Sequence, residues 1–112
     1  MAGLLGIHLI AATEDEVRAS VPVTDSLCQP LGLVHGGVYA TLADALTATT
    51  GRTVSNQTSF LRPITQGTIH ATARRRHNGR TTAVWEVDIT DDEGRLCALV
   101  RTTVYPVSEP GP

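Results

Sequence analysis

The chain of 112 residues is poor in several residue types, and each scarcity narrows what the protein can be. Aromatic residues make up only 4% of it, so the core must be built mainly from Val, Leu, Ile, Ala and Thr. Few aromatic side chains and a net charge of -2 also argue against a nucleic-acid partner, which calls for stacking platforms and basic surfaces. Lysine is absent and every basic residue is arginine, a compositional bias without direct functional meaning.

Cysteine is scarce as well. Cys28 and Cys97 are too few for a disulfide framework and have no metal-ligand spacing, which predicts two free thiols in a reducing compartment and no bound metal. No segment is long and apolar enough to span a membrane, and the N-terminus lacks the basic region of a signal peptide. We therefore expect a cytoplasmic protein with no membrane partner, folded as one domain over residues 1–112 with a frayed tail over 107–112.

Hydrophobic alternation and turn residues predict a mostly β chain. We expect strands over residues 5–12, 17–23, 53–61, 68–77, 81–90 and 95–105. Asn78-Gly79 is a strong hairpin turn, and the run from Asp91 to Gly94 is another. A long antiparallel meander packed on one helix is an α+β architecture.

The helix is predicted from the spacing of Val38, Leu42 and Leu46, and Gly51 is placed to end it after residue 50. Asp44 is anomalous, because Asp is a poor residue in the middle of a helix. Its face otherwise carries small residues, namely Gly37, Ala40, Thr41 and Ala48. Such a face allows another helix or a substrate to pack closely against the carboxylate.

Gly36 and Gly37 stand at the helix start, where the first N–H groups have no internal acceptor and favour an anionic oxygen. Asp44 lies roughly 10 Å from Gly37 along the axis, so one carbonyl cannot touch both. Two antiparallel copies of the helix about a two-fold axis would bring Asp44 of one chain level with the glycine amides of the other. This predicts a homodimeric acyl-transfer site in which the amides hold the oxyanion and Asp44 attacks or activates water.

At Gln29, Gly32, His35, Gly36, Gly37 and Asp44 the sequence resembles the phenylacetic-acid-pathway (PaaI-like) type of hotdog-fold acyl-CoA thioesterase. The pattern of that family is Asn-x-x-Gly-x-x-His-Gly-Gly followed by a helix with Asp or Glu. The segments 60–63 and 78–80 also fit, so the resemblance covers about residues 5–105. It implies a hotdog fold, in which a curved antiparallel sheet wraps around one central helix. It also implies hydrolysis of a small or medium, aliphatic or aromatic acyl-CoA without a cofactor, by a homodimer or a dimer-of-dimers tetramer.

The resemblance also implies roles for these residues. The Gly37 N–H, beside Gly36, would polarise the thioester carbonyl, while His35 and Gln29 would shape the pocket. Asp44 of the partner chain would be the nucleophile or general base. Thr53 best matches a serine or threonine that helps to position water in some relatives.

Arginines surround the Asn78-Gly79 turn, a region that in the family contacts the pantetheine or the phosphates of coenzyme A. Gly79, Arg80 and Arg62 are therefore candidate coenzyme A contacts. Strand alternation places Arg74 and Arg76 on one face and Arg75 on the other, so these arginines cannot all serve one ligand. For the other arginines, the alternative is that they lie in solvent at the end of the strand and contact no ligand.

Two departures from the family pattern keep a second hypothesis open. Gln29 replaces the usual Asn, and the segment between Asp44 and Phe60 is shorter than is usual. A catalytically inactive acyl-CoA-binding or assembly protein with the same fold would explain both. The intact Asp44 favours the enzyme, because a binding module has no evident need for a carboxylate there. The fold alone does not decide, since hotdog proteins also include hydratases and dehydratases with differently spaced motifs.

Overall fold

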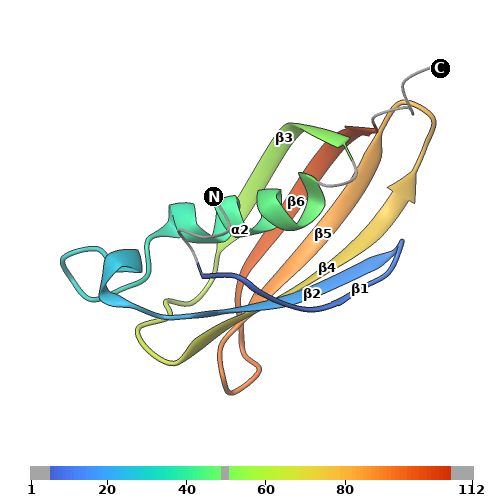
Figure 1. The fold of residues 1–112 in the computed structure, drawn as a ribbon. Coiled ribbons are helices and arrows are strands. Elements are labelled where there is room, and N and C mark those ends of the chain that lie inside the picture. The colour runs from blue at the N-terminus through green and yellow to red at the C-terminus, as the bar shows by residue number, and fades with distance from the viewer. Residues whose placement is uncertain (1–5, 49–50, 107–112) are drawn as a thin grey trace.

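The computed structural model describes residues 6–48 and 51–106. One antiparallel sheet packs on the helix α2 (Gly36–Thr47), which follows the short 3-10 helix η1 (Asp25–Leu27). The strands are β1 (His8–Ala12), β2 (Glu16–Pro22), β3 (Gly51–Phe60), β4 (Thr68–Asn78), β5 (Ala83–Thr90) and β6 (Leu96–Pro106). The sheet is twisted and curves along one side of α2 (Figure 1). This is the predicted α+β hotdog architecture.

The order of the strands differs from the predicted meander. The sheet runs β1-β2-β4-β5-β6-β3, so only β4, β5 and β6 follow one another as a meander. β3 pairs with β6 at one edge, where Phe60 lies opposite Ala98. Residues 61–67 then carry the chain back to β4 beside β2. Alternation reports which side chains face the core but not which strands are neighbours, and this is why the meander prediction was wrong.

The core lies between α2 and the concave face of the sheet. The predicted alternation of buried and exposed residues is confirmed in β4 and β5. In β4 the buried residues are Ile69, Ala71 and Ala73. In β5 they are Ala83, Trp85, Val87 and Ile89. The helix contributes a wider stripe than predicted. It consists of Val38, Tyr39, Leu42, Ala43, Leu46 and Thr47. Asp44 is outside this stripe.

A buried hydroxyl pair ties the helix to the sheet. Thr102 Oγ1 donates to Thr47 Oγ1 at 3.1 Å. Thr47 Oγ1 in turn donates to the Ala43 carbonyl at 3.0 Å. Because both threonines are fully buried, these bonds satisfy polar atoms that would otherwise be costly inside the core.

Two predicted boundaries are wrong. α2 ends at Thr47, and Gly51 is the first residue of β3 rather than the end of the helix. The β4–β5 connection covers residues 79–82, with Gly79 N–H donating to the Thr82 carbonyl at 2.8 Å. No non-glycine residue in the described ranges has a positive φ, so Asn78 lacks the left-handed conformation of a two-residue Asn-Gly turn. The turn after β5 forms as predicted, with Gly94 at φ 78° and its N–H bonded to the Asp91 carbonyl.

Several predictions concern residues that the structure does not describe. Three parts of these predictions lie outside the described residues: the tail over 107–112, the first residue of the strand predicted over 5–12, and positions 49 and 50 of the predicted helix. In the described part, no helix is both long and apolar enough to cross a membrane.

Replacing Leu42 with Ala tests the packing of α2. Leu42 is fully buried, so Leu42→Ala should reduce the free energy of unfolding by about 2–5 kcal/mol. Leu31→Ala is the matched control, because Leu31 is 83% exposed and its loss should change stability by less than about 0.5 kcal/mol. Chemical denaturation measures both variants. Equal effects would contradict the observed position of the helix.

Candidate active site

The segment before α2 is held by backbone hydrogen bonds. Gln29 N–H donates to the Leu33 carbonyl at 2.8 Å, and His35 N–H donates to the Leu27 carbonyl at 2.9 Å. Gly32 has φ 86°, a left-handed conformation that favours glycine and closes the turn between them. The backbone thus places Gln29 and His35 beside the start of the helix.

The helix begins at Gly36 with an open N-terminus. His35 is the N-cap residue, but its side chain makes no capping hydrogen bond. The Gly36 and Gly37 N–H groups lie in the first turn, which supplies them with no acceptor inside the helix. They also carry the positive end of the helix dipole, so they favour a negatively charged oxygen.

The two glycines have different surroundings. A Cβ atom on Gly36 would lie 2.5 Å from the Phe60 ring, so glycine allows this ring to rest against the helix. A Cβ atom on Gly37 would meet nothing within 4 Å. Packing against Phe60 therefore explains the absence of a side chain at Gly36, whereas no contact in the described part of the chain explains it at Gly37.

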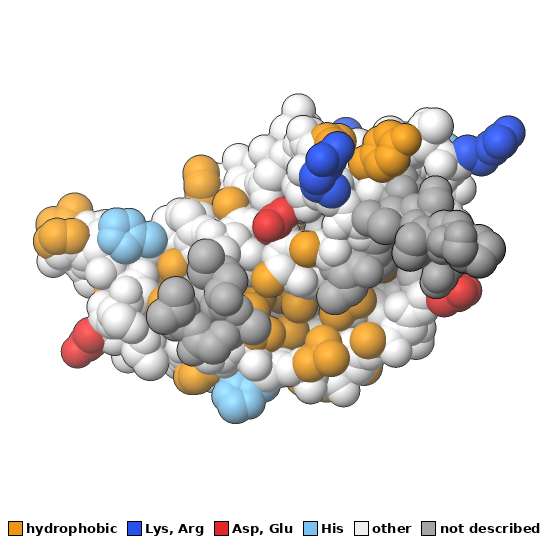
Figure 2. Space-filling view, turned by 45° about the horizontal axis from the view of Figure 1, so that its top comes forward, with side chains coloured by type: hydrophobic (Ala, Val, Ile, Leu, Met, Phe, Trp, Pro, Cys, Tyr) orange, Lys and Arg blue, Asp and Glu red, His pale blue; other side chains and the backbone are white. Residues whose placement is uncertain are grey.

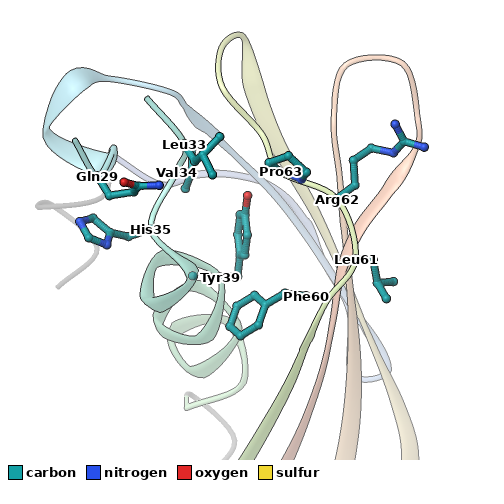
Figure 3. Close-up of a pocket in the computed structure, with 10 residues that line it drawn as sticks. Gln29, Leu33, Val34, His35, Tyr39, Phe60, Leu61, Arg62 and Pro63 are labelled. Atoms are coloured by element: carbon teal, nitrogen blue, oxygen red, sulfur yellow. The ribbon is translucent and has the colours of Figure 1, made fainter. Parts of the chain in front are cut away.

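A pocket of about 500 Å³ lies beside the helix start (Figure 3). Its walls are mostly hydrocarbon and aromatic, with a few polar groups, as in typical small-molecule sites. The lining residues are Gln29, Leu33, Val34, His35, Gly36, Tyr39, Phe60, Leu61, Arg62 and Pro63. Such a pocket can hold an apolar group with its polar end at the Gly36 amide.

Four of the predicted site residues meet at this pocket, namely Gln29, His35, Gly36 and Arg62. Gln29 Oε1 accepts a hydrogen bond from Leu31 N–H at 2.9 Å, which leaves the amide nitrogen as the donor for a ligand. In Figure 3, Gln29 and His35 lie on one side of the pocket and the Arg62 guanidinium extends away from it. Gly37 is adjacent in sequence but is not part of the described lining.

Asp44 lies on a different side of the helix. It is half-buried, and its neighbours on that side, Ala40 and Thr41, are also only partly covered. Asn56 of β3 donates from Nδ2 to the Ala40 carbonyl at 3.1 Å, which attaches this part of the helix to the edge strand. None of the described residues that line the pocket is acidic. The pocket of one chain therefore lacks a carboxylate base.

The remaining predicted residues lie elsewhere. Thr53 is in β3, and its Oγ1 is buried without a hydrogen-bond partner. Gly79 and Arg80 are in the β4–β5 connection, at the opposite end of β4 from the 61–67 segment (Figure 1). Because β4 has 11 residues, roughly 35 Å of strand separates these ends, and one chain does not bring Arg80 to its own pocket.

The arginines near this connection are divided as predicted. Arg74 and Arg76 lie on the outer face, where they pair with Glu16, Asp88 and Glu86. Arg75 is on the inner face, bound to Asp15 at 2.7 Å, with its guanidinium 5.9 Å from the centre of the Trp85 ring. In the described ranges, Arg80 and Arg62 have no acidic partner within salt-bridge distance, so they are the better candidates for phosphate contacts.

Sequence reasoning missed Tyr39, which lines the pocket and is only 3% exposed. Burial raises the pKa of its hydroxyl, while a hydrogen bond with the Ile64 backbone acts in the opposite direction. One signal for its place beside the pocket was available in the sequence, since Tyr39 lies one helical turn after Gly36. The predicted apolar stripe of the helix did not include it.

Both cysteines are free thiols, as predicted. Burial raises the pKa of Cys97, which makes this thiol a poor nucleophile. Within the described residues, no group of three or more His, Cys, Asp or Glu is placed to hold a metal ion.

Comparison with known proteins identifies the family. A model described as the thioesterase superfamily matches residues 31–98, and the chain therefore belongs to this superfamily. The proofreading thioesterase EntH of Cronobacter turicensis is 32% identical over 107 residues, which cover 87% of this chain and 78% of EntH. These matches make the chain a thioester hydrolase.

Solved structures of two proteins show the same fold. PaaI from the phenylacetic acid degradation operon of Escherichia coli is 30% identical and has a TM-score of 0.87, with 96% of this chain and 83% of PaaI covered. A thioesterase of Staphylococcus aureus, solved as a glutamine-to-alanine variant, is 25% identical and has a TM-score of 0.88, with 93% and 95% covered. A glutamate-to-alanine variant of the same protein also matches, with 26% identity. The predicted PaaI-like hotdog type is thereby confirmed.

A double-mutant cycle tests the contact between Gly36 and Phe60. Gly36→Ala should destabilise the protein, because the added methyl group displaces the Phe60 ring. In a Phe60→Ala background the same change should be neutral or stabilising, since Ala favours a helix more than Gly does. We expect a coupling energy on the order of 0.5–3 kcal/mol from chemical denaturation. Additive effects would mean that the two residues do not touch.

Proposed function

We propose that the protein hydrolyses an acyl-CoA thioester to a free acid and coenzyme A, at a site shared by two chains of a homodimer. One observation carries this proposal. The pocket of a single chain is lined by Gly36, at the start of α2, and by no acidic residue among the described ones, while the Asp44 carboxylate lies on another side of the same helix. A second chain is the simplest source of the missing base.

The donors would act on the thioester carbonyl. Its oxygen would face the Gly36 N–H at the positive end of α2, with the Gln29 amide nitrogen beside it. Donors already in place stabilise the negative charge that develops on this oxygen in the transition state. Our sequence prediction assigned this role to Gly37, but the position of Gly36 in the pocket wall favours Gly36, with Gly37 next to it.

Asp44 of the partner chain would complete the reaction in one of two ways. As a general base it would take a proton from water while the water oxygen attacks the carbonyl carbon. As a nucleophile it would form an anhydride that water then opens. In both cases the carbon–sulfur bond breaks and coenzyme A leaves as its thiol. His35 would shape the pocket beside the carbonyl.

The Staphylococcus aureus relative supports the roles of Gln29 and Asp44. The glutamine and the glutamate replaced in its two variants are separated by the same number of positions as Gln29 and Asp44. A glutamine at this place therefore fits a thioesterase, which weakens the case for an inactive binding or assembly protein.

The surface supports assembly into a dimer. Most of β3, an edge strand of the sheet, is exposed along its length. Val54 and Phe60 of this strand are 55% and 63% exposed. Figure 2 shows hydrophobic side chains uncovered in the middle of one face of the molecule. A second copy that covers such surface would also bring the two helices together, and pairs of dimers could then form a tetramer.

The walls of the pocket suit a small or medium acyl group, aliphatic or aromatic. Coenzyme A would extend from the pocket toward basic residues. Arg62 is at the pocket, whereas Gly79 and Arg80 could reach the same coenzyme A only from another chain. Thr53, with its unpaired buried hydroxyl, would assist with water from β3.

Replacing Asp44 tests the proposed chemistry. Asp44→Asn should reduce kcat by about 100-fold or more, because the amide can neither accept a proton nor attack the carbonyl. Asp25→Asn, in η1, should leave kcat unchanged. Coenzyme A release is measured across a panel of acyl-CoA esters that includes phenylacetyl-CoA. Equal rates for wild type and Asp44→Asn would refute the enzyme mechanism, and ester binding without turnover would favour the binding protein.

The phosphate contact has its own test. Arg80→Gln should raise KM for acyl-CoA esters by about 10-fold, consistent with loss of one charged hydrogen bond, while kcat stays the same. Arg76→Gln is the control, because Arg76 is paired with Glu86. Acyl-CoA substrates without the 3′-phosphate show which phosphate Arg80 contacts. If it contacts the 3′-phosphate, the KM of these substrates should be the same for wild type and Arg80→Gln. An unchanged KM on all substrates would remove Arg80 from the binding site.

A further inference from the structure

Asn56 stands in the middle of β3, although asparagine is depleted in strands and favours turns. The strand has one extra residue, Val54, because its register against β6 shifts between Thr53 and Ser55. Such a bulge moves every later side chain to the other face of the sheet. Asn56 is thereby turned toward α2, in the position directly opposite Thr102 of β6.

Two hydrogen bonds hold the Asn56 amide in one orientation. Asn56 Nδ2 donates to the Ala40 carbonyl of α2 at 3.1 Å. Thr58 Oγ1 donates to Asn56 Oδ1 at 2.9 Å. A carbonyl oxygen can only accept, so the amide nitrogen must face the helix, and the amide oxygen is left for the Thr58 hydroxyl. Both ends of the amide are therefore used inside the chain.

The contacted carbonyl belongs to the helical turn that carries Asp44. In an α-helix the Ala40 carbonyl also accepts the Asp44 N–H, so Asn56 binds the same oxygen as the Asp44 backbone. A second contact comes from the neighbouring strand, where Thr102 Oγ1 donates to Thr47 Oγ1 at 3.1 Å. Because Asn56 and Thr102 lie opposite each other, the sheet holds the helix on both sides of Asp44 along its axis.

We propose that Asn56 is a positioning residue for the Asp44 carboxylate, because its amide fixes the turn of α2 from which that carboxylate projects. This inference rests on the proposed function, since it requires Asp44 to act as base or nucleophile. A reacting group must be held to within about 0.5 Å of its productive position. A displacement of about 1 Å can lower a rate by as much as 100-fold.

The choice of asparagine fits positioning better than stabilisation. A β-branched side chain at this place would favour the strand more than Asn56 does. Asn56 is also exposed, and a hydrogen bond at an exposed site adds little to stability because water competes for both groups. The amide provides a directional bond from the edge strand to the partly uncovered side of the helix, the side with Asp44.

Asn56→Ala tests the inference, because it removes the amide and both of its hydrogen bonds. We would measure kcat and KM with the acyl-CoA ester that the wild type hydrolyses fastest. We expect kcat to fall by about 10-fold, as for a misplaced reacting group. KM should change by less than about 2-fold, because Asn56 is not in the described pocket lining. An unchanged kcat would overturn the inference.

Gln57→Ala is the matched control. It removes the amide of the next residue of the same strand, whose side chain points to the other face of the sheet. It should keep the kcat of the wild type. An equal decrease of kcat in Gln57→Ala and Asn56→Ala would overturn the inference, because the effect would then belong to the strand and not to the contact with α2.

An Asp44→Asn background shows whether Asn56 acts through Asp44. If it does, Asn56→Ala should not lower the residual kcat of Asp44→Asn any further. A further loss of about 10-fold would mean that Asn56 acts independently, and would overturn the inference. The activity per chain of Asn56→Ala should also be independent of protein concentration. Recovery at high concentration would overturn the inference as well, because Asn56 would then serve the association of two chains.

Thr58→Val gives a second variant, which keeps the shape of the side chain and removes the hydroxyl that holds the amide. It should lower kcat by about 3-fold, as expected for one neutral hydrogen bond, and leave KM unchanged. If Asn56→Ala does not fold, Thr58→Val decides, and an unchanged kcat would overturn the inference. Failure of the wild type to hydrolyse any ester would instead refute the proposed function, and this inference with it.

Discussion

The packing of one side of α2 into the curved sheet determines where every candidate group lies. Leu42 and Ala43 are fully buried, and the Thr102–Thr47 hydrogen bond fixes the end of the helix to β6. With this side committed to the core, the helix can neither rotate nor slide without exposing apolar surface or breaking a buried hydrogen bond. The first turn is therefore held at the pocket, and the side with Asp44 is left partly uncovered.

This arrangement separates the two groups that the proposed reaction needs. The glycine amides at the helix start are the proposed donors and Asp44 is the proposed base, but a rigid helix keeps them roughly 10 Å apart. In one chain, the pocket thus contains the proposed oxyanion site but no acidic residue in its described lining. Asp44 avoids the cost of a buried charge, since it lies outside the core and beside small residues that allow close approach. Association of two chains would make these two features parts of one site.

Much of this could be predicted from the sequence, because the signals are local. Alternation identified the buried faces of β4 and β5, and the run from Gln29 to Asp44 located both the helix start and the carboxylate. The position of β3 next to β6 could not be predicted, because strand order depends on contacts between distant segments. The Asn78-Gly79 dipeptide located the β4–β5 hairpin, but the connection covers residues 79–82 rather than the predicted 78–80. Tyr39 was missed because it lies outside the apolar spacing that predicted the helix, and a sequence does not show which side chains meet at a pocket.

The central claim, that two chains share each site, is tested most directly by mixing inactive subunits. Gln29→Ala and Asp44→Asn chains would be coexpressed with different affinity tags, and the doubly tagged heterodimer purified. If each site takes Gln29 from one chain and Asp44 from the other, the heterodimer has one intact site and one doubly defective site. It should then recover about half of the wild-type activity per dimer, although each homodimer of variant chains is inactive. If each chain formed a complete site alone, every site would keep one defect, and a heterodimer as inactive as its parents would contradict the account.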